Sequence, residues 1–120
     1  MTNLSLYLIA QHFIPRLISL KKTSPKSSPA LLVTSSHLPF HPEPSLFTLS
    51  FVKAAQRNMV HSFYKQFGKE GVHCGVVSVE GMVSHEKSEL NPKNIAVKTV
   101  GFWEGGVERG VEVRVVEPEE

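Results

Sequence analysis

The stretch V-H-C-G-V-V-S-V at residues 72–79 decides the fold that this chain is predicted to adopt. It is short, almost entirely apolar and rich in valine, which is the pattern of a strand buried on both faces. An apolar helical pattern over residues 46–67 precedes it, with Ser45 as the predicted N-cap. Gly68 and Gly71 are expected to end that helix. A buried strand directly after a long helix indicates a chain in which helices and strands alternate.

Before this pair of elements, the sequence predicts another helix and another strand. Apolar residues at spacings of three and four indicate an amphipathic helix over residues 3–20. Pro15 is expected to kink this helix rather than end it. Residues 21–29 form a polar loop, and A-L-L-V-T at 30–34 has the pattern of a strand buried on both faces. Residues 35–45 contain three prolines and are predicted to be irregular.

A third helix and a third strand follow. Asn91 is the predicted cap of a helix over residues 92–103, which opens with proline. The stretch V-E-V-R-V-V at 111–116 alternates and predicts a half-exposed strand, and residues 117–120 are predicted to be a solvated tail. Strands that alternate with helices favour a parallel sheet, so residues 1–120 are predicted to form one α/β domain.

Composition and charge argue against several classes of function. The net charge is only +2, which argues against a dedicated nucleic-acid binder. All 11 acidic residues are Glu, which excludes any mechanism that needs an Asp. No apolar run approaches the roughly 20 residues that span a membrane. The spacing of His37 and His41, and the adjacent His73 and Cys74, do not form a structural metal motif, so we expect no metal and an inert core thiol.

The first 42 residues are basic and rich in serine. They hold no acidic residue, which is typical of an organelle transit peptide. The alternative interpretation is a structural helix followed by a polar loop, and it implies a cytoplasmic protein. We favour the structural helix.

Four features resemble the second half of a short-chain dehydrogenase/reductase. They are L-L-V-T-S-S at 31–36, Lys53-Ala54-Ala55, V-S-V-E-G-M-V at 77–83, and L-N-P-K-N-I-A at 90–96 followed by Phe102-Trp103. In order, they are similar to the strand that ends in the family's active-site serine, the lysine of its Tyr-x-x-x-Lys motif, its strand before a Pro-Gly loop, and its next helix. The resemblance covers nearly the whole chain and implies a partial Rossmann-like, doubly wound parallel sheet.

The resemblance also implies a lineage and a site. The lineage is that of NAD(P)-dependent oxidoreductases that act on alcohols or carbonyls. Ser36 and Lys53 would be the remnant catalytic residues, and Lys53, Gly81 and Val83 would contact NAD or NADP. From the residues alone, Ser36 could instead form a turn and Lys53 could be a solvated helix residue.

The chain departs from the family where catalysis and cofactor binding need it most. Leu49 stands at the position of the family's tyrosine, and leucine can neither ionise nor donate a proton. Glu80 replaces the proline of the Pro-Gly loop. No glycine precedes Gly68, so residues 1–67 cannot hold a glycine-rich phosphate loop. We therefore expect a truncated and catalytically inactive member, or a fragment of a longer gene product, that does not bind NAD or NADP with useful affinity.

The alternative function is non-enzymatic. The helices at 3–20 and 46–67 correspond to elements through which many members of the family dimerise, so the chain could pair with itself or with a full-length relative. The strand at 30–34 would also leave one edge unpaired. We therefore expect the isolated chain to be oligomeric or only marginally stable.

Overall fold

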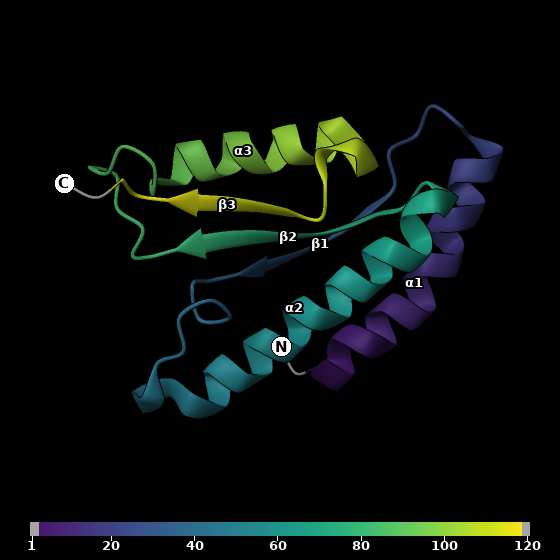
Figure 1. The fold of residues 1–120 in the computed structure, drawn as a ribbon. Coiled ribbons are helices and arrows are strands. Elements are labelled where there is room, and N and C mark those ends of the chain that lie inside the picture. The colour runs from purple at the N-terminus through teal and green to yellow at the C-terminus, as the bar shows by residue number, and fades with distance from the viewer. Residues whose placement is uncertain (1–2, 119–120) are drawn as a thin grey trace.

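The computed structural model describes residues 3–118, in which three helices alternate with three strands. The elements are α1 (Asn3–Thr23), β1 (Ala30–Ser35), α2 (Phe47–Phe67), β2 (His73–Glu80), α3 (Pro92–Gly105) and β3 (Glu112–Val116). The strands form one parallel sheet in the order β1-β2-β3. Helices α1 and α2 cover one face of the sheet and α3 covers the other (Figure 1). The predicted α/β class is confirmed, and the topology is that of a partial Rossmann-like, doubly wound parallel sheet.

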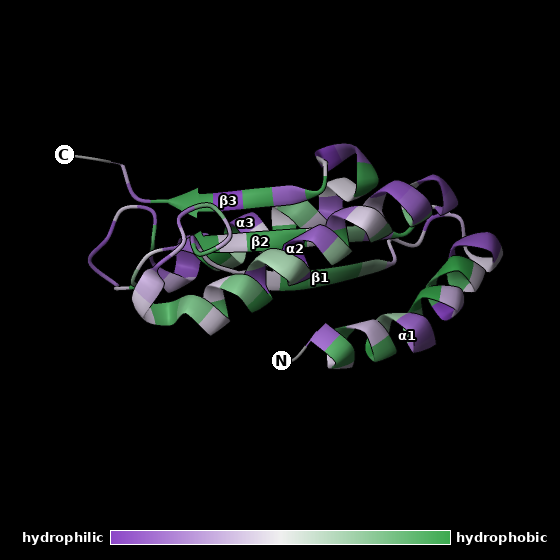
Figure 2. Ribbon diagram, turned by 60° about the horizontal axis from the view of Figure 1, so that its bottom comes forward, coloured by the Kyte–Doolittle hydropathy of each residue, from purple (hydrophilic) through white to green (hydrophobic). Residues whose placement is uncertain are grey.

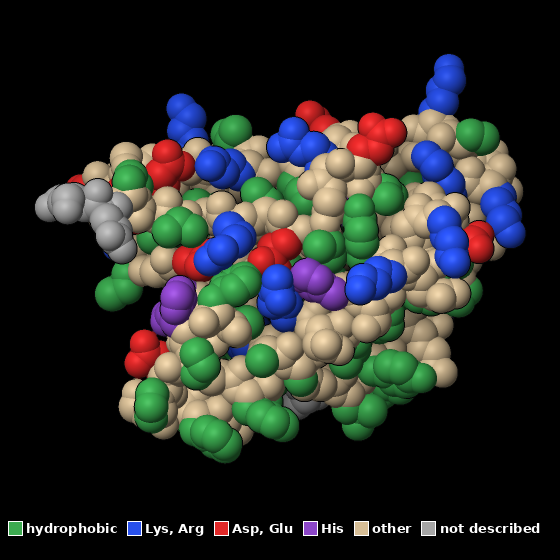
Figure 3. Space-filling view, viewed as in Figure 1, with side chains coloured by type: hydrophobic (Ala, Val, Ile, Leu, Met, Phe, Trp, Pro, Cys, Tyr) green, Lys and Arg blue, Asp and Glu red, His purple; other side chains and the backbone are tan. Residues whose placement is uncertain are grey.

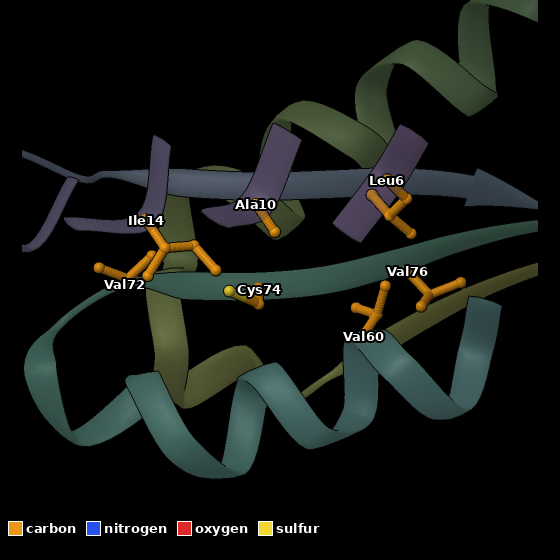
Figure 4. Packing of buried hydrophobic residues seen from close by; sticks show 7 residues of the cluster. All are labelled: Leu6, Ala10, Ile14, Val60, Val72, Cys74 and Val76. Atoms are coloured by element: carbon orange, nitrogen blue, oxygen red, sulfur yellow. The ribbon is translucent and has the colours of Figure 1, made fainter. Parts of the chain in front are cut away.

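The central strand β2 carries the core on both of its faces. Successive side chains of a strand point to opposite faces, and Cys74 and Val76 point toward α1 and α2 (Figure 4). The buried residues that pack with them are Leu6, Ala10, Ile14, Val60 and Val72. On the other face, the Phe102 ring of α3 packs against Gly75. Figure 2 shows green, hydrophobic colour on β2. The residues from His73 to Ser78 are buried, so the predicted burial of this strand on both faces is confirmed.

Strand β1 lies at an edge of the sheet, and its residues are mostly half-buried. The prediction that it is buried on both faces is therefore wrong, because within residues 3–118 only β2 pairs with it. The backbone N–H of His73 donates to the carbonyl of Pro29 at 3.0 Å. By the alternation of a parallel ladder, the peptide groups of Leu32 and Thr34 then point outward at the free edge. Strand β3 is half exposed, as predicted.

The helix ends agree with the sequence prediction at some positions and not at others. Asn91 caps α3 as predicted, since its side chain accepts a hydrogen bond from the Asn94 N–H at 2.8 Å. Ser45 does not cap α2. A 3-10 turn over Pro44–Leu46 precedes the helix, and Leu46 occupies the N-cap without a side-chain hydrogen bond. Pro44 opens this turn and thereby takes Ser45 into it.

The other helix ends differ from the prediction by a few residues. Helix α1 contains Pro15, as predicted, but continues to Thr23 rather than ending at residue 20. Helix α3 continues past Trp103 to Gly105. Helix α2 ends at Gly68 as predicted, and a short 3-10 turn follows it, after which Gly71 adopts a φ of 84°.

The apolar stripes of α1 and α2 are wider than the surface that the sheet covers. In α1, Tyr7 and Phe13 remain about half exposed. In α2, Val52, Ala55, Met59, Phe63 and Phe67 recur at helical spacing, and none of them is fully buried. The residues of α2 that are buried are Ser50, Gln56 and Val60. Within residues 3–118, no helix combines the length and apolar character that a membrane span needs.

The chain end is not entirely the solvated tail that was predicted. The Glu117 carboxylate accepts hydrogen bonds from the backbone N–H groups of Ser88, Glu89 and Leu90, each at 2.9 Å. The Ser88 hydroxyl donates a fourth at 2.7 Å. Glu117 therefore organises the loop between β2 and α3, and residues 119–120 lie outside the described part of the chain.

Candidate functional site

The carboxyl ends of the three strands meet at one edge of the sheet, on the side of the arrowheads in Figure 1. This is the edge at which open parallel α/β sheets bind ligands. A hollow of about 480 Å³ lies there, between the loop after β1, the start of α2 and the loop after β2. We call it the carboxyl-edge hollow.

Four of the five residues that the resemblance placed at a site line this hollow. They are Ser36, Leu49, Lys53 and Gly81. The fifth, Val83, is 46% exposed on the loop after β2 and does not line the hollow. The structure thus brings together residues from three separate segments, because both loops and the start of α2 lie at the same edge of the parallel sheet.

Ser36 follows the last residue of β1. Its hydroxyl oxygen accepts a hydrogen bond from the Leu38 N–H at 3.3 Å, and the N–H groups of Phe40 and His41 both donate to the His37 carbonyl at 2.9 Å. Ser36 therefore has the turn-forming role that was one of its two interpretations. Its hydroxyl hydrogen is not used in that bond, so a ligand in the hollow could accept it.

Lys53 lies on α2, one turn after Leu49. Its ammonium group donates to the side-chain oxygen of Gln56 at 3.4 Å, and it makes no ion pair with any residue from 3 to 118. The side chain is half-buried. Lys53 therefore brings a positive charge to the hollow that no neighbouring carboxylate neutralises.

The hollow has no phenol. At the position where the family carries its tyrosine, Leu49 presents only carbon. The chain has two tyrosines, and neither lines the hollow. The Tyr64 hydroxyl donates to the Val107 carbonyl at 2.8 Å, and Tyr7 lines a different groove, between α1 and α2. No tyrosine in this fold stands where it could relay a proton to a ligand in the hollow.

The loop after β2 is shaped by a glycine and by an ion pair. Gly81 has a φ of 144°, and a Cβ there would lie 2.7 Å from Leu90 Cδ1, so both the backbone and the packing require glycine. Glu80 forms a two-bond ion pair with Arg114 on β3, at 2.5 and 2.6 Å, and its side chain is 4% exposed. The acid at the position where the resemblance places a proline is therefore bound within the sheet.

Sequence analysis missed a cluster that holds the loop after β1 in place. The guanidinium groups of Arg57 and Arg114 lie 4.7 and 4.0 Å from the centre of the Phe40 ring. Cations near an aromatic face attract it electrostatically. Arg57 also pairs with Glu112 at 2.8 Å, and His61 approaches the same oxygen at 3.5 Å. These residues come from the loop, α2 and β3, and no local sequence pattern signals such a cluster.

The remaining histidine and cysteine candidates lie outside the hollow, apart from His37. His73 is buried, its Nε2 lies 2.8 Å from the Gly110 carbonyl, and burial lowers the pKa of its ring. Burial also raises the pKa of the Cys74 thiol to about 12, so the thiol is a core residue as predicted. Among residues 3–118, no three His, Cys or Glu side chains gather in a way that could hold a metal ion.

Neither a family model, a curated protein nor a solved structure matches the chain.

Proposed function

We propose that the chain is a catalytically inactive relative of the short-chain dehydrogenases/reductases, in which the ligand hollow persists without its proton donor. The observation that carries this proposal is the convergence of Ser36, Leu49, Lys53 and Gly81 on one hollow at the carboxyl edge of a parallel sheet. The lineage implies NAD(P) chemistry on alcohols or carbonyls.

Inactivity follows from the chemistry of two regions. Proton transfer to a reacting oxygen needs an ionisable group within hydrogen-bond reach, and Leu49 supplies none. Dinucleotide phosphates are usually held by a glycine-rich turn at a helix N-terminus. No such turn occurs in the sequence given, in which every glycine lies at or after Gly68.

Calorimetric titration with NADH and NADPH, followed by a turnover assay on a panel of aldehydes and ketones, tests the proposal. We expect no binding in the low micromolar range, which corresponds to about −8 kcal/mol, and no turnover. Leu49→Tyr should not rescue turnover, since the phenol alone supplies no cofactor site, and Leu49→Phe is its matched control. Turnover by Leu49→Tyr but not by Leu49→Phe would show that a dinucleotide site exists.

A second candidate function is pairing with another chain, and a specific surface favours it. A groove of about 310 Å³ runs between α1 and α2. Its lining is mostly apolar and includes Ile14, Ile18 and Phe63. Leu8 and Phe13 of α1 are about half exposed on the same layer, and hydrophobic side chains gather over this layer in Figure 3. Contiguous apolar surface of this kind marks interfaces, so we propose pairing with a second copy or with a full-length relative.

Sedimentation velocity at several concentrations tests the pairing. We expect the wild-type chain to form a dimer. Phe13→Glu should shift it to monomer because the substitution places a charge on the apolar layer. Gln66→Glu adds the same charge at an exposed position of α2 outside the groove and should leave the dimer intact. A wild-type chain that stays monomeric at tens of micromolar would rule out pairing with a second copy.

A further inference from the structure

Each polar side chain that lines the carboxyl-edge hollow carries a hydrogen-bond donor; they are Thr34, Ser35, Ser36, His37 and Lys53. His37 Nε2 lies 3.9 Å from the Glu43 carboxylate. The Lys53 ammonium group donates to Gln56 at 3.4 Å and has no ion-pair partner among residues 3–118. The Ser35 hydroxyl oxygen is buried and has no hydrogen-bond partner in the described part of the chain, and the Ser36 hydroxyl keeps its hydrogen free. No Glu lines the hollow, because Glu80 is paired with Arg114 instead. A site of donors and one cation favours an anionic hydrogen-bond acceptor.

The rim of the hollow is apolar and unusually exposed. Leu46, Leu49 and Met82 line it, with exposed fractions of 47%, 46% and 80%. On the same turns of α2, the rings of Phe47 and Phe51 stack with their centres 6.5 Å apart and are 73% and 67% exposed. Figure 3 shows hydrophobic side chains over the start of α2. A rim of this kind favours a ligand with hydrocarbon to cover it.

We infer that the carboxyl-edge hollow binds a small monocarboxylate with an apolar body, an inference that rests on the proposed persistence of the hollow as a ligand site. The carboxylate accepts hydrogen bonds from Ser35 and Ser36 and is neutralised by Lys53, while the hydrocarbon lies along Leu49 and Met82. One lysine matches one negative charge, whereas a phosphate dianion would leave a charge unpaired. The volume of about 480 Å³ lies within the range of small-molecule sites.

Calorimetric titration with octanoate tests this inference, with butyrate and the neutral octanamide as comparison ligands. We expect octanoate to bind with a sub-millimolar Kd and butyrate at least tenfold more weakly. Lys53→Met should weaken octanoate binding at least tenfold and leave octanamide binding unchanged. Lys65→Met removes a lysine from an exposed position of the same helix and should change neither. Met82→Ser, at an exposed loop position, should weaken the binding of octanoate and of octanamide to the same extent. This variant tests the site if Lys53→Met does not fold.

Several results would overturn the inference. One is an octanoate Kd that Lys53→Met leaves unchanged, and another is a loss of octanoate affinity in Lys65→Met as large as that in Lys53→Met. A third is tighter binding of inorganic phosphate than of octanoate. A fourth is loss of octanoate binding in Tyr7→Ser, which alters only the groove between α1 and α2. Failure to detect octanoate binding at millimolar concentration would also overturn the inference. Cofactor binding or carbonyl turnover would contradict the proposed inactivity but not carboxylate binding, so the two can fail separately.

Discussion

At the scale of single residues, Gly75 shows how closely α3 approaches the sheet. A Cβ at this position would lie 2.6 Å from Phe102 Cε2 and 3.2 Å from Leu32 Cδ2. Both neighbours are side-chain atoms in the packed layer beneath α3, and Phe102 is only 1% exposed. The fully buried ring has little room to move, so a methyl group would have to displace it.

Gly75→Ala should therefore destabilise the fold by about 1–3 kcal/mol, as overpacking in a core does. Gly101→Ala is the matched control, because nothing lies within 4 Å of the added Cβ and the residue is inside α3. It should stabilise by up to about 1 kcal/mol through helix propensity. Urea denaturation of the three proteins measures both changes. Equal effects of the two substitutions would show that Phe102 does not pack on Gly75.

Glu117 gives a prediction about pH. Hydrogen bonds, the largest from the Leu90 N–H, lower the pKa of its carboxyl from the ordinary 4.5 to about 2. Because the folded pKa is the lower one, its contribution to stability is complete above about pH 4.5 and is lost as the pH falls toward 2. Glu117→Gln should lower the melting temperature at pH 7, and the gap to wild type should shrink by pH 2. Glu86→Gln, at an exposed position of the loop that Glu117 binds, is the control and should leave the melting temperature at pH 7 close to that of the wild type.

The site could be predicted in part at this scale. Leu49 and Lys53 are four residues apart on a helix, so their shared face follows from spacing alone. Ser36 and Gly81 join them because both follow strands of one parallel sheet. The Phe40 cluster could not be predicted, because its members come from the loop after β1, α2 and β3. Val83 is absent from the hollow because the backbone turns at Gly81.

At the scale of secondary-structure elements, helices α2 and α3 differ in how their N-termini are capped. Asn91 accepts from the Asn94 N–H at 2.8 Å, and its amide group donates to the Lys87 carbonyl at 2.9 Å. Helix α2 instead begins after a 3-10 turn, without a side-chain cap. The Asn-Pro pair at the start of α3 is a local signal, and it predicted the cap correctly. A serine directly after a proline is ambiguous, because Pro44 can open its own turn.

Asn91→Ala should destabilise the fold by about 1 kcal/mol or more, since the cap and a loop contact are lost together. Asn91→Ser keeps an oxygen at the cap and should recover part of the loss. Asn58→Ala, at an exposed position of α2, should stay within about 0.5 kcal/mol of wild type. Thermal unfolding followed by circular dichroism compares the three. A loss in Asn58→Ala as large as that in Asn91→Ala would contradict a specific role for the cap.

At the scale of the whole molecule, the sheet formed by residues 3–118 has free edges at β1 and at β3, and the layer formed by α1 and α2 exposes apolar side chains. The order of elements and their parallel arrangement followed from the alternating sequence patterns. The degree of burial did not, because periodicity identifies the apolar side of a helix but not how much surface covers it. The partial burial of the α2 stripe and the edge position of β1 both depend on which other elements pack against them in the folded chain.

The free edge at β1 leads to a prediction about aggregation. The Thr34 N–H points outward from β1, and the side chain is exposed. Thr34→Pro removes this donor without breaking the bonds to β2, so it should slow aggregation on mild heating, measured by light scattering. Thr34→Val keeps the N–H and should aggregate at least as fast as wild type. Equal aggregation rates for Thr34→Pro and Thr34→Val would show that the β1 edge does not drive aggregation.

The buried Cys74 has a consequence for experiments on this protein. It is the sole thiol in the sequence and is enclosed between β2 and the layer of α1 and α2. Thiol reagents attack the thiolate, which the high pKa of this group, about 12, makes scarce at neutral pH. Labelling therefore requires the helices to separate from the sheet. When reclosing is faster than labelling, the labelling rate in buffer divided by that in urea gives the equilibrium constant for this opening. The labelling rate of the native cysteine thus reports how stably α1 and α2 pack on the sheet, without an engineered probe.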